Sequence, residues 1–266
     1  MRALSFACFL CTTGVFAQLG ASNNTPGAPQ STITMGVQTF GPTLSGHMQG
    51  TLDGQPTQVD LDGDLGIGKD GAKTGFFFDY QGHRFGFQAS TSSTEYAGNR
   101  IMTRNVIVDG ANYPIGSQVQ SRVKLASLDG IWTIKFVSEP DAWMGLDLGL
   151  QIWTLDLKTA GSLLAVLTPP SSNVSIKAPL PQVGLSGGSR GYNGAFESKA
   201  YIRYMKAKGG AYLMVGTDLR MFITRWFGLR AFYESSRLSG SKGAVKDDLE
   251  IGIDRKGIGF GGVVRF

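Results

Sequence analysis

The sequence is poor in the residues on which thiol chemistry and most acid–base catalysis depend. Its 266 residues include only two cysteines, Cys8 and Cys11, and two histidines, His47 and His83. Both cysteines lie close to the N-terminus in an apolar stretch, so we expect no disulfide framework and no thiol chemistry in the rest of the chain. Charged residues make up 17% of the sequence, against roughly 25% in a typical soluble domain.

Long apolar runs are also missing beyond the N-terminus. Arg2, the apolar run Ala3 to Ala17 and the small-residue pattern before Gln18 are typical of an export signal. We therefore assign residues 1–17 to a signal peptide cleaved near Ala17, and the polar, proline-containing residues 18–31 to a flexible periplasmic lead-in. No later run approaches the roughly 20 residues that a spanning helix needs.

The C-terminal stretch from Leu249 to Phe266 shows what the chain has instead. Apolar and aromatic residues recur there at every second position, with Ile258, Phe260 and Phe266 on one face. Period two indicates a β-strand. No segment follows to cover this face, so we infer that it contacts lipid. With 38 glycines, 11% aromatic residues and a mean hydropathy near zero, at -0.02, residues 32–266 fit one repetitive barrel.

The same alternation recurs along the chain. It is clearest from Ala142 to Lys158, where Met144 and Leu148 share one face and Asp147 lies on the other. In Ser117–Val137 the apolar phase shifts between Leu125 and Leu128, which suggests a β-bulge. The strands we expect are 33–52, 74–80, 83–96, 117–137, 142–158, a weak one at 179–187, 195–205, 211–223, 227–237 and 249–266.

Short and long connections alternate between these strands, with 206–210 as a short exception. Short periplasmic turns and longer outer loops are typical of bacterial barrels. Aromatic residues beside the short turns or the C-terminus predict an interfacial girdle: Tyr80, Phe85, Phe136, Trp143, Trp226, Phe227 and Phe266. We predict an all-β fold, a transmembrane antiparallel up-and-down β-barrel of about ten strands, with eight or twelve as alternatives.

The terminal strand with its final Phe266 resembles that of small Gram-negative outer-membrane β-barrel proteins, a porin-like family with uncharacterised members. The segments 60–66 and 179–185 are similar to theirs as well. This resemblance implies an outer-membrane location, contact with outer-membrane lipid, and recognition of Phe266 by the barrel assembly machinery. It implies no activity. The net charge of +5 fits ordinary surface charge and solubility, with contact with anionic lipopolysaccharide as the alternative, and without a basic cluster we expect no nucleic-acid binding.

Charged residues on the face opposite the lipid should line the interior. We expect a lumen network of acids and bases in near balance: Asp79, Arg84, Asp147, Glu197, Lys199, Arg203, Asp218, Arg220, Arg230, Glu234 and Arg265. Such a lining either neutralises itself in ion pairs that plug the lumen or borders a narrow passive channel. The sequence leaves both open, so we predict a structural or surface protein, or a passive channel.

Other chemistry finds little support. The alternating acids Asp60, Asp62 and Asp64 are a pattern found in calcium-binding loops. Leu65 and Gly71, however, stand where an EF-hand loop needs glycine and glutamate. His47 has no nearby serine or aspartate motif, His83 lies beside a tight turn that we expect in the periplasm, and Asp247–Asp248 lacks an Asp-His companion. We therefore expect no catalytic residue, no metal and no cofactor. A barrel enzyme acting on envelope lipid or peptide and a secreted soluble β-sandwich remain alternatives.

Overall fold

The computed structural model describes residues 31–52, 54–67, 73–162, 170–207, 209–241 and 248–266. The proposed signal peptide and almost all of the proposed lead-in lie outside the described residues. The described chain forms β1 (Thr32–Leu52), β2 (Gln55–Asp60), β3 (Lys73–Gln81), β4 (Phe85–Ile101), β5 (Val106–Val108), β6 (Ala111–Tyr113), β7 (Gln118–Ser138), β8 (Ala142–Ser162), β9 (Ser171–Gly191), β10 (Phe196–Ala207), β11 (Gly210–Phe222), β12 (Phe227–Gly240) and β13 (Glu250–Arg265). Within those residues, no helix is long and apolar enough to cross a membrane.

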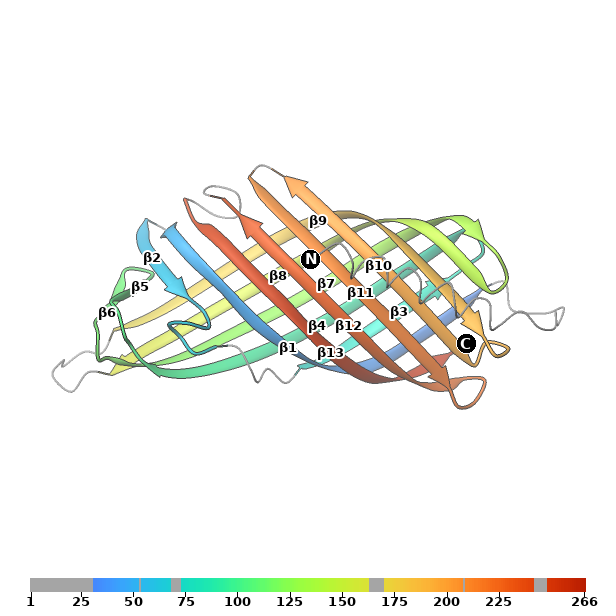
Figure 1. The fold of residues 1–266 in the computed structure, drawn as a ribbon, viewed down its shortest axis with the longest axis horizontal. Helices are drawn as coiled ribbons and strands as arrows, with labels where there is room; N and C mark the ends of the chain where they lie inside the picture. Colours follow the sequence, from blue (N-terminus) through green and yellow to red (C-terminus); the bar gives the residue numbers. More distant parts are fainter. Residues whose placement is uncertain (1–30, 53, 68–72, 163–169, 208, 242–247) are drawn as a thin grey trace, which may run out of the picture.

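Ten of these strands close into a single antiparallel barrel. Their order is β13-β12-β11-β10-β9-β8-β7-β4-β3-β1, and β13 pairs with β1 to complete the ring. Figure 1 shows the strongly tilted strands side by side, with β2, β5 and β6 gathered at one end. The prediction of an all-β up-and-down barrel of about ten strands is confirmed. A sheet closed on itself excludes the alternative of a two-sheet sandwich.

The two ends of the barrel differ in their connections. One, which we call the turn end, carries the short turns at 82–84, 139–141, 192–195 and 223–226, together with the start of β1 and the end of β13. The other, the loop end, carries the longer connections and the one short connection between β10 and β11. The alternation expected from the sequence is therefore present, including its exception.

β1 runs without interruption through Pro42, a residue that usually disrupts a central strand. Its ladder with β3 ends at Thr39, and its ladder with β2 begins at His47. Pro42 lies in the gap between these two ladders, so its missing N–H removes no bond to either strand.

The half of the barrel nearer the turn end, which we call the turn half, has an apolar band on its outer surface. Side chains that point outward there are exposed and large: Val37, Phe76, Phe85, Leu128, Trp132, Ile134, Phe136, Met144, Leu146, Leu148, Leu150, Val183, Leu185, Leu219, Met221, Leu229, Tyr233, Ile258 and Phe260. Phe85 and Phe87 both pack against Trp132, with ring centroids 6.3 and 5.9 Å apart. A continuous apolar belt around a barrel is the surface that lipid covers.

In the half nearer the loop end, which we call the loop half, the apolar side chains lie on the inner face of the barrel and the polar ones on the outer face. On β7, Leu125 is fully buried inside the barrel, while Leu128 is 52% exposed on the outside. The β7–β8 register is unbroken through both residues, and its one shift falls between Lys135 and Val137. The bulge predicted between Leu125 and Leu128 is therefore wrong: the apolar pattern changes phase because the interior becomes apolar there, not because the strand is interrupted.

Two further expectations need correction. β9 is not a weak strand at 179–187, because it pairs with β8 from Ala142↔Ser189 to Ala160↔Ser171. Trp143 does not join the aromatic girdle, because its side chain points into the barrel beside Lys199. Phe85, Phe136, Trp226 and Phe266 are exposed at the turn end as expected.

Candidate functional site: the barrel interior

The interior of the loop half is a hydrophobic core. Its members come from nearly every strand of that half and include Leu44, Met48, Tyr96, Val119, Val123, Leu125, Trp153, Leu155, Leu157, Val174, Ile176, Tyr212, Leu238, Ile251 and Ile253. The connection after β2 adds Leu61, Leu65 and Ile67, each no more than 1% exposed. A space filled in this way holds no column of water.

The segment 60–67, which we call the cap, is held in place by specific bonds. The Leu61 N–H donates to the Gly46 carbonyl at 2.8 Å, and the Ser121 hydroxyl donates to the Leu65 carbonyl at 2.9 Å. Arg104 forms a two-pronged ion pair with Asp64, its Nε lying 2.9 Å from Oδ1. The cap therefore closes the loop end as a packed element.

The carboxylates of Asp60 and Asp64 are engaged by groups that hold the cap in place. The Gly63 N–H donates to the Asp60 carboxylate at 2.7 Å, and Asp64 is engaged by Arg104. Burial raises the pKa of Asp60, but hydrogen bonds from Gly63 and Asp62 outweigh it and bring the pKa below its ordinary value. Across the part of the chain that the structure describes, no three His, Cys, Asp or Glu side chains are grouped as metal ligands.

The interior of the turn half is polar and ionic. Arg220 on β11 reaches across the lumen to Asp79 on β3, with Nη2 2.6 Å from Oδ2. The same guanidinium contacts Asp218 at 2.9 Å. Arg203 pairs with Asp147 at 2.9 Å between strands that are not neighbours. The Arg220–Asp79 pair ties distant walls together, whereas the Arg203–Asp147 pair bridges the two neighbours of β9; both occupy part of the lumen's cross-section.

Most of the residues predicted for the lumen lie in this network. Asp79, Asp147, Glu197, Lys199, Arg203, Asp218, Arg220 and Arg230 are all buried, Glu234 pairs with Arg255, and Arg265 lies 3.2 Å from Glu197. Arg84 lies apart, exposed in the turn between β3 and β4, because β4 begins at Phe85 and not at residue 83 as predicted.

Sequence reasoning missed several members. Arg255 is 3% exposed, and Asp129, Lys135 and Arg190 also face inward. A usable signal existed for Arg255, because it has the same odd-numbered phase on β13 as Arg265. For Lys135 and Asp129 the misplaced bulge obscured the phase of β7.

Glycine makes room for the large interior side chains. Gly216 lies directly opposite Tyr201 in the β10–β11 ladder. A Cβ atom at Gly216 would come within 2.3 Å of the Tyr201 ring. The ring in turn lies under the Arg203 guanidinium, 4.2 Å from its centroid. A side chain at position 216 would therefore displace the aromatic partner of a network arginine.

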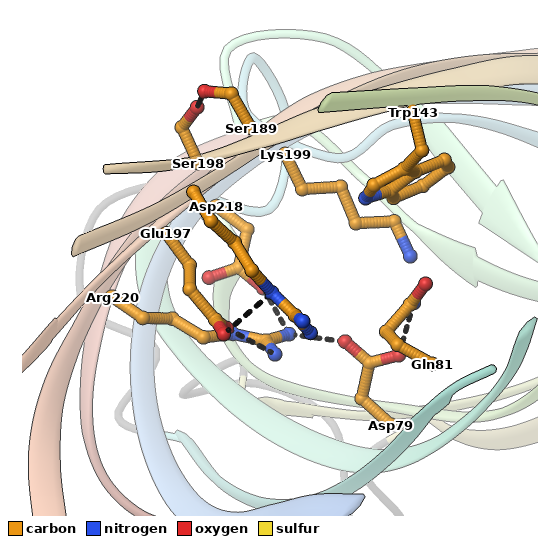
Figure 2. A pocket seen from close by; sticks show the side chains of 10 residues that line it. Asp79, Gln81, Trp143, Ser189, Glu197, Ser198, Lys199, Asp218 and Arg220 are labelled. Atoms are coloured by element: carbon orange, nitrogen blue, oxygen red, sulfur yellow. Dashed lines mark hydrogen bonds and ion pairs between the residues drawn. The ribbon is translucent and has the colours of Figure 1, made fainter. Parts of the chain in front are cut away.

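Two small cavities lie between these side chains. A cavity lined by Gln88, Tyr201, Arg203 and Arg230 measures about 30 Å³. A second, at the turn end, measures about 20 Å³ and is lined by residues that include Trp143, Lys199 and Arg220. Figure 2 shows this second cavity, with Trp143 and Lys199 on one side and Asp79 and Gln81 on the other. Each has room for one or two water molecules.

The two histidines lie outside the interior. His47 is exposed on the outer wall, 4.0 Å from Glu250. His83 lies in a turn, with its Nδ1 3.3 Å from the Ser138 hydroxyl. That hydroxyl donates to the His83 carbonyl at 2.6 Å, so it is fixed to the backbone. Asp247 lies outside the described residues, and Asp248 is exposed.

No family model and no curated protein matches the chain, but solved structures resemble it. The outer membrane protease OmpT from Escherichia coli aligns over 92% of this chain and 99% of its own, with a TM-score of 0.61 and 13% identity. The translocator domain of the autotransporter NalP from Neisseria meningitidis aligns over 97% and 96%, with a TM-score of 0.44 and 12% identity. At such identities the likeness to OmpT shows the fold alone, which is that of a closed outer-membrane β-barrel.

Proposed function

We propose that this protein is an integral outer-membrane barrel that conducts no solutes and acts through the part that projects beyond the membrane. The observation that carries the proposal is that the apolar face of the strands changes from the outside of the barrel to its inside along their length. The turn half is apolar outside and ionic inside, as in a membrane-embedded barrel. The loop half is polar outside and apolar inside, as in a water-soluble barrel.

The proposed orientation follows from the connections. Short turns and both ends of the barrel chain face the periplasm in bacterial barrels, so the loop half with its cap would stand outside the cell. A wall of long strands, β4, β7, β8 and β9, would form much of this projecting surface. Its packed interior supports a rigid platform for surface contacts.

Lipopolysaccharide is the partner we propose at the edge of the apolar band that is nearer the loop end. Exposed lysines lie just beyond the last lipid-facing residues on four strands: Lys124, Lys177, Lys206 and Lys256. Ammonium groups at that height would meet the phosphates of the outer leaflet.

An enzymatic role receives no comparable support. Among the described residues, Ser138 and His83 are the serine and histidine in contact, and the hydroxyl is engaged with the backbone. A triad needs that proton to be available to the imidazole. We therefore propose a non-enzymatic role, with Phe266 as the signal read by the assembly machinery.

Labelling of intact cells tests the location and orientation. We would compare the variants K158C, on the projecting outer wall, and R84C, in a turn, using a membrane-impermeant maleimide. Both side chains are exposed, and the chain has no cysteine beyond Cys11. We expect K158C to react in intact cells and R84C to react only after the outer membrane is permeabilised. The reverse pattern, or equal reaction in intact cells, would overturn the proposal.

A further inference from the structure

One long strand of the projecting wall has a free edge. β9 pairs with β8 as far as Ala160↔Ser171, but its ladder with β10 stops at Val183↔Tyr204. Among the residues that the structure describes, no strand pairs with residues 171–182 on the β10 side. This part of β9 is therefore the edge of a sheet, with backbone groups that can pair with a further strand.

The backbone groups that face this edge belong to the odd-numbered residues. At the two ends of the β8–β9 ladder, the Arg190 N–H donates to the Asp141 carbonyl and the Gly161 N–H donates to the Pro170 carbonyl, each at 2.8 Å. Even-numbered residues thus face β8, and the register between these ends is unbroken. Because successive residues of a strand direct their N–H and C=O groups to opposite sides, the odd-numbered ones present theirs to the free edge.

Two prolines limit the part of this edge that can pair fully. Pro179 and Pro181 are odd-numbered, so the N–H that each lacks would have faced the free edge. Proline on an edge strand protects against unwanted pairing. Residues 171–177, which we call the open edge, contain no proline. The open edge therefore keeps every N–H and C=O group that points away from β8.

Two other strand edges of the loop half are covered. β4 extends beyond its ladder with β3, which begins at Thr94, but the cap lies against this extension, where the Arg100 side chain donates to the Asp62 carbonyl at 2.9 Å. β1 extends beyond the same ladder and pairs with β2 from His47 onward. Within the described part of the chain, the open edge of β9 has neither kind of cover.

A second copy in the same membrane does not fit the open edge. Two identical edges pair antiparallel about a two-fold axis perpendicular to the sheet. That axis would invert the second barrel relative to the membrane. A two-fold axis along the membrane normal would instead cross the two tilted strands, so their backbone groups could not align. The geometry therefore favours an extended segment of a different protein.

The charges beside the open edge favour an acidic segment. Lys177 is its one charged residue, and the side chain is exposed on the outer face. On β8, the exposed Lys158 lies opposite Asn173. Asp156 accepts a hydrogen bond from the Ser175 hydroxyl at 2.7 Å, so that carboxylate is engaged by the edge strand itself. A carboxylate placed across from Lys177 would add a favourable cross-strand pair.

We propose that the open edge binds an extended, acidic peptide segment of a partner protein by β-strand addition. The incoming strand would exchange backbone hydrogen bonds with the odd-numbered residues from 171 to 177 and place a carboxylate beside Lys177. Its alternate side chains would continue the inner apolar layer at Val174 and Ile176. This inference rests on the proposed function, because it assigns a class of partner to the projecting half.

Binding of a dye-labelled synthetic peptide to the refolded full barrel tests the site. The peptide alternates valine and threonine, is capped at both ends, and has aspartate in place of one threonine. We expect a saturable rise in fluorescence anisotropy. The same peptide with N-methyl groups on its pairing edge should not bind, because strand addition needs those N–H groups. Equal binding of the two peptides, or no binding of either, would overturn the proposal.

Two positions on the barrel locate the bound peptide. N173P removes an N–H from the open edge and should weaken binding about tenfold, whereas N173A keeps that N–H and should bind as the native chain does. K177E should weaken binding of the aspartate peptide and strengthen binding of a peptide with lysine in the same place. Native-like binding by N173P, or an unchanged preference in K177E, would contradict the site.

Heat-dependent gel migration verifies that each variant is folded. If N173P does not fold, the N-methylated peptide and K177E still decide. Peptide binding is measured on the isolated barrel and does not depend on its orientation in cells. It can therefore fail while surface labelling supports the proposed function, and the reverse result is equally distinguishable.

Discussion

Arg220 and Asp79 join opposite walls of the barrel through a 2.6 Å contact between buried side chains. Arg220 also holds Asp218 at 2.9 Å and approaches Glu197 at 3.7 Å. One guanidinium therefore contacts three carboxylates, of which Asp218 and Glu197 also contact other arginines. Removing Arg220 should therefore disturb more contacts than removing the charge of Asp79.

The first prediction concerns this inequality. R220Q removes the arginine partner of Asp79 and one cationic contact each of Asp218 and Glu197, and it should destabilise the barrel by about 3–5 kcal/mol. D79N leaves Arg220 with two acidic partners and should cost about 1–3 kcal/mol. Urea unfolding in lipid vesicles, followed by the shift between folded and unfolded gel bands, measures both. Equal losses would contradict the shared role of Arg220.

A second prediction tests the exchange of faces on β7. Leu125 is buried in the core and Leu128 faces outward. L125A should cost about 2–5 kcal/mol because it leaves a cavity in a packed interior. L128A should cost markedly less, since lipid chains fill the space. Unfolding in the same vesicles compares the two, and a larger loss for L128A would place the core on the wrong side of the strand.

A third prediction locates the edge of the lipid-covered band on β8. L148R places a charge on an exposed apolar side chain and should cost about 2–4 kcal/mol if it lies near the bilayer centre. T154R, further along the same outward face, should change the unfolding free energy by less than about 0.5 kcal/mol. A comparable loss in both variants would show that the band extends into the loop half.

The predictability of the fold from sequence differed between the two halves. Alternation identified the outward faces of β8 and β13, because lipid-facing residues such as Leu148 and Phe260 are far more apolar than their neighbours. Apolar residues in the loop half obey the same period with the opposite direction. Leu125 and Leu128 are the same residue type, so hydrophobicity alone cannot say which contacts lipid and which contacts the core.

The candidate site shows a related limit. Phase placed Asp79, Asp147 and Arg220 on the inner face, because a strand repeats every second residue. Phase does not show which arginine reaches which acid, since Arg220 and Asp79 come from strands that meet only across the closed barrel. The start of β4 at Phe85 likewise has no marker that would have excluded Arg84.

A fourth prediction concerns the close fit of Gly216 and Tyr201. G216A adds a Cβ atom 2.3 Å from the partly buried Tyr201 ring and should cost about 1–3 kcal/mol through overpacking. G130A is the matched control, because nothing lies within 4 Å of its added atom. If urea midpoints shift equally in both variants, the contact between Gly216 and Tyr201 does not limit stability.

A fifth prediction concerns the cap. R104Q removes the ion pair with Asp64, whose side chain is 8% exposed, and should raise the rate at which protease cuts between residues 61 and 67. R122Q removes an exposed pair with Glu95 and should leave the rate unchanged, because surface pairs contribute little. Equal cleavage in both variants would show that packing alone holds the cap.

The central claim is that two filled layers, the apolar core of the loop half and the ionic network of the turn half, close the barrel to solutes. Single-channel recording of the refolded barrel in a planar bilayer tests it most directly, after heat-dependent gel migration has verified folding. The account predicts no conductance for the native chain or for R104Q, since loosening the cap leaves the ionic network of the turn half in place. Steady, reproducible conductance steps from the native barrel would contradict it.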